Sequence, residues 1–542
     1  MGIPSYFSHV IRKYASILRN TKHFLDNNIR FTHLYMDCNS IVYDSYHAMS
    51  ETYTVDTHDS FEDKLIVDVA KRIDDYIYMI KPTEVVYVAF DGIVPLGKMH
   101  QQRKRRYKTQ LMASLQRDTN SIPKWNTASI TPGTIFMDKL SSYMYSYFNH
   151  KERRYNVANI IVSCSDKSGE GEHKLYSHIR NNDMKHANVS VYGLDADLIM
   201  LSILHLKYCN NIYVFREAPE FLKSSIAVSV KNNNEPCFLD INHLSKSIVT
   251  EMDCKYDLST RIEDYVFMCF FLGNDFLPHF VALNIRTSGI NVLLDVYRQC
   301  IGNYSNRSLI STETDGIDWK CFKIFVTELA KLEPELMKQE HYAREKLEKR
   351  HSHANTNATK NKELKYTELV LSVRGVEKYV SVLCEGWESR YMRVCKSSVL
   401  NYVSLLSWLW CYYKKDVSIL SEVYEIKYAP LLCELRKCSV DVLELCELES
   451  VGRRKLSEEV MCNLDAYTQL SYVLPRSSLN LLPKCIEEEL LKESPELYPS
   501  SCNLENAYCT YLWECHPDLP EISVETLEKW NKRNILYRES LK

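Results

Sequence analysis

Acidic residues follow apolar segments at several points in this sequence of 542 residues. In residues 191–201 (VYGLDADLIML) a strand-like run stops at a glycine, and Asp195 and Asp197 follow it two residues apart. Because the carboxyl end of a strand in a parallel sheet opens onto the ligand crevice, both aspartates should lie at its mouth, where two anions need a cation. The alternative is that Asp195 caps a helix and Asp197 lies in its first turn, where the helix dipole stabilises negative charge.

The same arrangement recurs along the chain. Strand-like runs end at Asp37 and Asp91, a third leads into SDKSGEGEHKL, and residues 264–272 form a buried helix or strand that ends in GNDF. The acids that follow these elements are Asp37, Asp91, Glu170, Glu172, Asp195, Asp197 and Asp275. Gathered in one place without counter-charge, these carboxylates would repel one another strongly.

Hard divalent cations would remove this repulsion. Mg²⁺ prefers oxygen ligands in near-octahedral geometry, so a carboxylate cluster with few His or Cys donors indicates Mg²⁺, with Mn²⁺ as the alternative, over zinc. Two such ions can bind the attacking and the leaving oxygen of an in-line phosphodiester displacement. The seven acids are therefore the predicted catalytic and metal-binding residues.

A basic segment, residues 98–117 (KMHQQRKRRYKTQLMASLQR), comes directly after the strand that ends at Asp91. On a helix with about 100° per residue, four of its side chains share one face: Lys98, Gln102, Arg105 and Arg106. Arginine offers the bidentate geometry that a phosphate prefers, so this face predicts a socket for a terminal phosphate. A solvated charged helix or a run like a nuclear-localisation signal is the alternative, and the neighbouring acidic strand end favours the socket.

Strands that alternate with helices predict an α/β fold with a mostly parallel sheet flanked by helices. We expect strands ending at Asp37, at residues 85–90, at residues 160–163 and before Gly193, and a helix that begins after Glu172. Residues 338–365 are polar and predict a linker or a loosely ordered helical extension. They separate a first region, residues 1–337, from a mainly helical region, residues 366–542, which has no acidic constellation and should supply support, substrate-channel walls or partner contacts.

Composition narrows the class of protein. The chain has 45% hydrophobic and 25% charged residues, as is typical of a globular protein, and its net charge of -3 means that any nucleic-acid site must be a local basic patch. Nineteen cysteines without a C-x-x-C pair disfavour a structural zinc site and favour reduced thiols. The most apolar window, residues 399–413, falls short of the roughly 20 residues that span a bilayer and predicts a buried helix. We expect a cytoplasmic protein without a membrane partner, and the nucleus is the alternative compartment.

Ten segments of the chain, in order, resemble the XRN/Rat family of 5'-to-3' exoribonucleases. In the first region these are MGIPSYF, LYMDCNSIVY, AFDGIVPLGKMHQQRKRRY, ITPGTIFM, SGEGEHKLYSHIR, VYGLDADLIML and FFLGNDFLPH. In the last region they are YVSLLSWLWCYY, KYAPLL and QLSYVLPRSSLNLLP, which look like the family's second conserved region. The likeness therefore extends over nearly the whole chain.

The resemblance implies a PIN/FEN-like nuclease core in residues 1–337 and a processive, Mg²⁺-dependent hydrolase. Its substrate would be single-stranded RNA with a 5'-monophosphate, from which it would release mononucleotides during mRNA decay. By motif position, the seven acids match the family's ligands of two Mg²⁺ ions. Lys98, Gln102, Arg105 and Arg106 match its 5'-phosphate pocket, and residues 2–7 match a segment that packs near the active site. The decapping machinery is the candidate protein partner of what we expect to be a monomer.

The chain departs from the family at two aromatic positions. Tyr43 stands where the family has a histidine that stacks on the first base, and a tyrosine can still stack; the alternative is a half-buried core tyrosine. The family's tryptophan before its YAP motif has no counterpart: Leu420 or Glu422 stands near its place, and Tyr424 is the candidate substitute.

Two other functions are compatible with the residues. One is a flap-type structure-specific nuclease, which shares the acid-lined α/β chemistry. The other is a catalytically silent RNA-binding scaffold of the same fold, but such a protein has no physical reason to keep seven crowded carboxylates.

Overall fold

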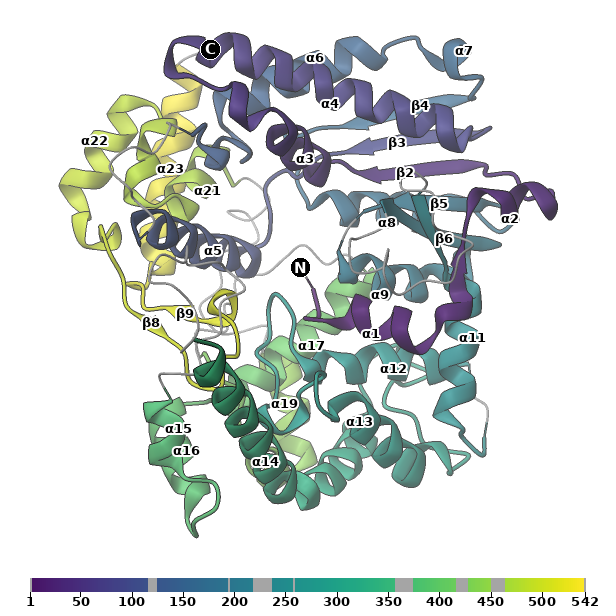
Figure 1. Cartoon of the computed structure of the whole chain (residues 1–542), viewed down its shortest axis with the longest axis vertical. Helices are drawn as coiled ribbons and strands as arrows, with labels where there is room; N and C mark the ends of the chain where they lie inside the picture. The colour runs from purple at the N-terminus through teal and green to yellow at the C-terminus, as the bar shows by residue number, and fades with distance from the viewer. Residues whose placement is uncertain are drawn as a thin grey trace.

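A seven-stranded mixed sheet forms the centre of the N-terminal half of the chain (Figure 1). The computed structural model describes residues 2–115, 124–193, 195–217, 236–256, 259–355, 374–415, 427–449 and 464–540. In spatial order the strands are β1 (Leu18–Arg19), β7 (Pro236–Asp240), β6 (Asn211–Glu217), β5 (Asn188–Tyr192), β2 (His33–Asp37), β3 (Val85–Ala89) and β4 (Asn159–Ser163). Strands β2 to β6 pair in parallel, and β7 and β1 pair antiparallel. The predicted α/β class with a mostly parallel sheet is confirmed.

The register places the ends of three neighbouring strands side by side. Asp37, the last residue of β2, pairs with Ala89 of β3, and Met36 pairs with Tyr192 of β5. The residues that follow these strands therefore emerge together at the carboxyl edge of the sheet, where a ligand crevice forms in α/β folds.

Helices cover both faces of the sheet. One face carries α3 (Asn39–Met49), α4 (His58–Ile80) and α6 (Ile135–Phe148), and the other carries α8 (Gly171–Asn181), α9 (Ala196–His205) and α11 (Ile241–Met252). Leu34 and Met36 of β2 join the core of the first face and Tyr35 joins that of the second, because successive side chains of a strand point to opposite faces. Figure 1 shows α4 and α6 on one side of the strands and α8 and α9 on the other.

Two expectations from the sequence need correction or completion. Helix α8 begins at Gly171, with Glu170 at its N-cap, so Glu172 lies inside the first turn and not ahead of the helix. The N-terminus of a helix stabilises negative charge, which places both acids favourably. Residues 264–272, left open between helix and strand, belong to α12 (Arg261–Cys269) and a following 3₁₀ turn.

The second half of the chain is mainly helical. Its helices are α13 (Gly289–Tyr297), α14 (Trp319–Asn355), α15 (Gly375–Val380), α16 (Trp387–Cys395), α17 (Val399–Lys415), α18 (Leu432–Lys437), α19 (Val440–Glu449), α21 (Ala466–Val473), α22 (Lys484–Glu493) and α23 (Val524–Ser540), with a small sheet of β8 (Leu504–Glu505) and β9 (His516–Pro517). Helix α17 is the buried helix predicted from its apolar window. None of the described helices is long and apolar enough to cross a membrane.

Helix α14 runs through the boundary expected near residue 337. Its residues 338–355 continue the helix, and Glu340 and Arg344 are buried, so this part of the polar segment is packed and not a loose linker. Residues 356–365 lie outside the described part of the chain. The division of the chain into domains stays a prediction.

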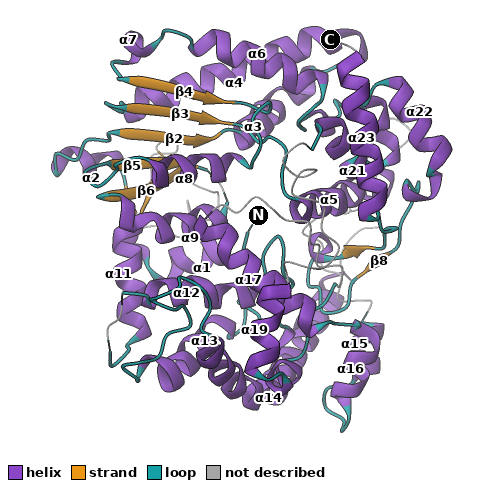
Figure 2. Cartoon of the chain, turned by 180° about the vertical axis from the view of Figure 1, so that it is seen from behind, coloured by secondary structure: helices purple, strands orange, loops and turns teal. Residues whose placement is uncertain are grey.

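The basic helix α5 (Leu96–Leu115) lies against the C-terminal helices. Figure 2 shows α21 and α23 next to it, and Leu96 and Met99 belong to one hydrophobic cluster with residues of these helices. The buried Arg103 guanidinium donates hydrogen bonds to the carbonyl oxygens of Leu497, at 2.8 Å, and Pro520, at 2.7 Å. The alternative of a solvated charged helix is therefore wrong, since α5 is anchored by its own arginine.

Candidate active site

The carboxyl ends of β2 and β3 bring Asp37 and Asp91 together. The side chain of Asn39 donates to the Asp91 carboxylate, and the amide N–H of Gly171 donates to Asp91 Oδ1 at 2.7 Å. A Cβ on Gly171 would lie 2.7 Å from Asp37 Oδ1, so only glycine lets α8 begin this close to both carboxylates.

All seven predicted acids lie in one cluster. Burial raises the pKa of Asp37 well above its usual value, and the charges of Asp91 and Asp195 raise it further. The pKa of Glu172 is raised by burial and then by Asp197 and Glu170. Burial and the neighbouring Asp275 raise the pKa of Asp197 to about 6. The crowding that the sequence predicted is therefore present, while the roles of the acids in catalysis stay a prediction.

The Asp195 segment lies at a helix start and also at the acidic cluster, while its binding of a cation stays a prediction. Asp195 occupies the N-cap position of α9 and Asp197 lies in its first turn, yet the Asp195 side chain makes no capping hydrogen bond. Its charge instead acts on Asp37, across the site. The position is a helix start, but the carboxylate belongs to the acidic cluster.

Lys98 enters the cluster from the first turn of α5. Its Nζ atom lies 2.6 Å from Glu170 Oε2 and 2.9 Å from Asp275 Oδ2. Burial acts to lower the pKa of Lys98, but Glu170 and Asp275 hold it well above its usual value. Burial likewise acts to raise the pKa of Asp275, which Lys98 holds below its usual range. Lys98, predicted as a phosphate ligand, thus also supplies counter-charge to two predicted metal ligands.

The donor set fits a hard divalent cation. Asp37 Oδ1 is buried and has no hydrogen-bond partner among the residues that the structure describes. Ligand atoms of Glu170, Glu172 and His173 lie within 4.8 Å of one another. Buried carboxylate oxygens that lack donors are the ligands that Mg²⁺ and Mn²⁺ prefer.

Two tyrosines of α17 hold carboxylates of the cluster. The Tyr412 hydroxyl donates to Glu170 Oε1 at 2.5 Å, and the Tyr413 hydroxyl donates to Asp197 Oδ1 at 2.6 Å. All four residues are buried. The sequence analysis missed both tyrosines, because an apolar window predicts a buried helix but not what its hydroxyl groups contact. The C-terminal region thus does more than support the fold, since it contacts the site directly.

Helix α8 supplies two further residues that the sequence analysis missed. The centroid of the His173 ring lies 3.9 Å from that of the Tyr412 ring. Burial, followed by the charge of Lys98, keeps the pKa of His173 well below its usual value. The Lys174 ammonium donates to the carbonyl oxygens of Phe90, at 2.7 Å, and Cys164, at 2.8 Å. Lys174 therefore ties the ends of β3 and β4 together below the acids.

The N-terminal segment packs against the cluster, as the resemblance implied. Gly2 has a φ of +51°, and a Cβ there would lie 2.3 Å from Asp197 Oδ1. Glycine is thus required at this position both by its backbone conformation and by the close approach to the carboxylate.

The remaining socket residues lie further along α5. Gln102 is buried, and its Oε1 atom has no partner within the described part of the chain. One Arg106 nitrogen donates to Thr131 Oγ1 at 2.5 Å, and another is buried without a described partner. Burial lowers the pKa of Arg106 to about 10, although the nearby Tyr43 acts to raise it. Arg105 lies one turn beyond Gln102 and two turns beyond Lys98, on the same side of α5. The face is therefore cationic and partly buried, and its role as a phosphate socket stays a prediction.

Tyr43 lies on α3, half-buried, and its phenol acts electrostatically on Arg106. It therefore stands beside the predicted socket, and it also packs against the core of its sheet face. Its role in base stacking stays a prediction. Leu420, Glu422 and Tyr424, named for the missing tryptophan, lie outside the described residues.

Two family models and several curated proteins match the sequence of this chain. The family model described as XRN 5'-3' exonuclease N-terminus matches residues 1–218, and that described as Xrn1 helical domain matches residues 255–382. A 5'-3' exoribonuclease 2 of Candida albicans is 28% identical over 407 residues, which are 64% of this chain and 41% of the relative. A 5'-3' exoribonuclease 1 of Schizosaccharomyces pombe is 30% identical over 376 residues, 63% of this chain and 27% of the relative. The chain thus spans less than half of the length of these curated relatives.

Among solved structures, the catalytic core of Rad2 in complex with a DNA substrate matches with a TM-score of 0.31 and 13% sequence identity, over 62% of this chain and 77% of that one. The two family models follow each other along the chain and cover both the acidic cluster up to Asp197 and the segment around Asp275. The chain belongs to the XRN family of 5'-3' exonucleases.

Proposed function

We propose that the chain is a 5'-to-3' exoribonuclease that hydrolyses single-stranded RNA with a 5'-monophosphate and releases mononucleotides processively. One observation carries the proposal: Lys98, the first residue of the cationic face of α5, contacts Glu170 and Asp275. The predicted phosphate socket and the acidic cluster are therefore adjacent, so a gripped 5' end would present its first phosphodiester bond to the carboxylates.

Each part of the site has a task in this reaction. Two Mg²⁺ ions held by the carboxylates would activate a water molecule and stabilise the leaving oxygen. Arg105 and Arg106 would bind the terminal phosphate, and the buried Gln102 amide would orient it. Tyr412 and Tyr413 would keep Glu170 and Asp197 in the orientation that ligation requires.

The proposed socket would favour a single terminal phosphate. The Arg106 guanidinium donates a hydrogen bond to Thr131 Oγ1, which would favour one position of this group and a socket of the size of one phosphate. A capped or triphosphate end would therefore be excluded, and the enzyme would depend on a reaction that produces monophosphate ends. We accordingly propose decapping factors as its suppliers, mRNA decay as its process and the cytoplasm as its place, which fractionation of cells that express the tagged chain would test.

The test is a time course with one single-stranded RNA, labelled at its 5' or its 3' end and carrying a monophosphate or a triphosphate. We expect immediate release of labelled mononucleotide from the 5' label, only with Mg²⁺ and only from the monophosphate RNA, and no release with EDTA. Asp195→Ala and Asp197→Ala should abolish release and keep part of the end binding, because the socket is untouched.

Four results would speak against parts of the proposal. Internal fragments would indicate an endonuclease, and cleavage of a DNA flap in preference to the RNA would indicate a flap-type nuclease. Binding of the RNA without any release would indicate a silent scaffold. Full turnover by Asp197→Ala would remove the metal-site assignment.

A further inference from the structure

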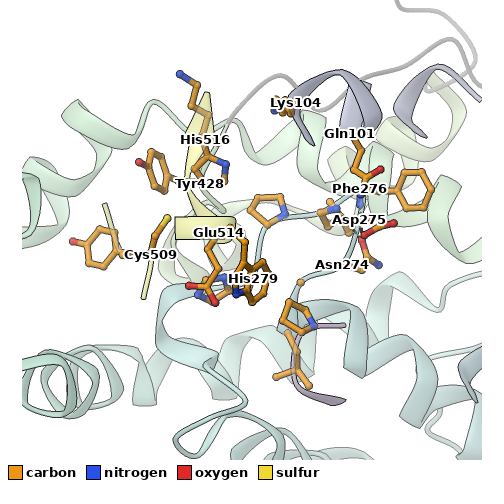
Figure 3. A pocket seen from close by; sticks show the side chains of 18 of the residues that line it. Gln101, Lys104, Asn274, Asp275, Phe276, His279, Tyr428, Cys509, Glu514 and His516 are labelled. Atoms are coloured by element: carbon orange, nitrogen blue, oxygen red, sulfur yellow. Dashed lines mark hydrogen bonds between the residues drawn. The ribbon is translucent and has the colours of Figure 1, made fainter. Parts of the chain in front are cut away.

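A pocket of about 240 Å³ lies beside the predicted phosphate socket (Figure 3). Helix α5 lines it with Gly97, Gln101, Lys104 and Lys108, which recur every three or four residues and so form one stripe of the helix. This stripe is rotated from the face of Gln102 and Arg106, neither of which lines the pocket. Arg105 lies between the two faces and lines the pocket as well.

The pocket wall carries more positive than negative charge. Among the described residues, neither Lys108 nor Arg105 forms a salt bridge with a carboxylate, and the Lys108 ammonium donates a hydrogen bond to the carbonyl oxygen of Trp513, at 2.6 Å. The two acids in the wall are already paired: Asp275 with Lys98, at 2.9 Å, and Glu514 with Arg286, at 2.7 Å. A pocket of this charge attracts an anion.

Three other polar groups of the pocket wall are available to bind a ligand. Gln101 Oε1, Asn274 Nδ2 and His100 Nε2 are buried and lack a hydrogen-bond partner in the part of the chain that the structure describes. They offer an acceptor, a donor and an imidazole nitrogen, in a wall that also contains the aromatic residues Tyr428 and Trp513. Buried polar atoms without a partner are costly, and a bound ligand is one way to satisfy them.

We propose that this pocket binds a nucleoside 5'-monophosphate, the product of the proposed exonuclease reaction. Its phosphate would lie between Arg105 and Lys108, and its base would lie between the aromatic residues and the unpartnered amides. The volume is near the lower limit of about 300 Å³ for small-molecule sites, which suits one nucleotide and not a longer chain. Because Arg105 belongs to both sites, the phosphate of a released nucleotide could pass along it and free the socket for the next RNA phosphate.

The inference rests on the proposed function, but binding of the product can be measured without turnover. The probe is adenosine 5'-monophosphate (AMP), titrated into the full chain by calorimetry, with adenosine as the uncharged reference. We expect AMP to bind much more tightly than adenosine, and Lys108→Ala to weaken AMP about tenfold, the loss of one charge-assisted contact. Gln101→Ala should also lower the affinity for AMP. This variant replaces Lys108→Ala in the test if Lys108→Ala does not fold. Lys331→Ala, an exposed lysine on α14, is the matched control and should change nothing.

Two further measurements distinguish binding in the pocket from binding in the socket and from binding of an RNA chain. Arg106→Ala disables the socket and should leave AMP binding in the pocket intact. The proposal would be overturned if Arg106→Ala lost AMP binding while Lys108→Ala and Gln101→Ala kept it. Lys108→Ala should lower the affinity for a 5'-phosphorylated oligonucleotide less than it lowers the affinity for AMP. A larger loss for the oligonucleotide would assign the pocket to the RNA chain and overturn the product site.

The outcomes distinguish this proposal from the proposed function. An active exoribonuclease whose AMP affinity does not depend on Lys108 or Gln101 would overturn the pocket alone. A chain that binds AMP through Lys108 but releases no nucleotide from RNA would contradict the proposed function, and with it the naming of AMP as a product.

Discussion

Removal of one hydroxyl group from α17 should change the pH dependence of the proposed RNA hydrolysis. Tyr413 donates to Asp197 Oδ1 at 2.6 Å, and both side chains are buried. Burial is the main cause that raises the pKa of Asp197 to about 6, and the Tyr413 hydrogen bond acts in the opposite direction. Tyr413→Phe should therefore raise the pKa of Asp197 further.

The size of the effect follows from the hydrogen bond. A bond to a charged group contributes roughly 1.5 to 3 kcal/mol, which corresponds to about 1 to 2 pKa units at 1.36 kcal/mol per unit. A carboxyl that is mostly ionised at pH 7 in the wild type would then be half or more protonated. Since a metal ligand must be deprotonated, we expect about a twofold to tenfold loss of rate at pH 7 and low Mg²⁺, with recovery as the pH rises.

The assay is the rate of mononucleotide release from 5'-labelled RNA between pH 6 and 9, at limiting and at saturating Mg²⁺. The acidic limb of the profile should move to higher pH in Tyr413→Phe, and saturating Mg²⁺ should move it back because the metal competes with the proton. Tyr391→Phe is the control, since its hydroxyl donates to the Ala429 carbonyl, at 2.9 Å, away from the site. An unchanged limb in Tyr413→Phe, or an equal shift in both variants, would refute the role assigned to this hydrogen bond.

Three other substitutions test the remaining parts of the site. Arg106→Ala should erase the discrimination between monophosphate and triphosphate RNA, and a variant that still discriminates would contradict the socket. Lys98→Met leaves two buried carboxylates without their counter-charge and should destabilise the metal-free protein by about 3 to 5 kcal/mol. Mg²⁺ should restore much of the lost melting temperature. An equal loss of melting temperature with and without Mg²⁺ would argue against a metal beside Lys98. Gly171→Ala would place a Cβ 2.7 Å from Asp37 Oδ1 and should lower the apparent Mg²⁺ affinity in the same rate assay, with an unchanged circular dichroism spectrum as the check on folding.

The strand-end acids could be predicted from the sequence because the geometry of a parallel sheet determines where they lie. A run of β-forming residues that ends in an acid places that acid at the carboxyl edge, and parallel strands align their carboxyl edges. Asp37 and Asp91 therefore meet without any further information. The helical face of Lys98 and Gln102 was predictable for a similar reason, since the period of a helix fixes which side chains share a face.

The tyrosines of α17 could not be predicted in this way. Tyr412 and Tyr413 are 242 and 216 residues from the carboxylates that they contact, and no local period relates them. Their hydroxyl groups are buried, which requires a partner, but the sequence does not say which. The same holds for Lys98, whose place on the basic face predicted a phosphate contact and whose two ion pairs depend on how α5 lies against the sheet.

These long-range contacts make the site a property of both halves of the chain. The sheet edge supplies the carboxylates, but α17 supplies the hydroxyl groups that orient Glu170 and Asp197, and α5 is fixed in place by the bonds of Arg103 to the C-terminal region. A cluster of like charges is stable only where donors and cations surround it, so the carboxylates need these elements before any metal binds. The helical region is therefore part of the proposed active site in the physical sense that it sets the charge and the geometry of the acids.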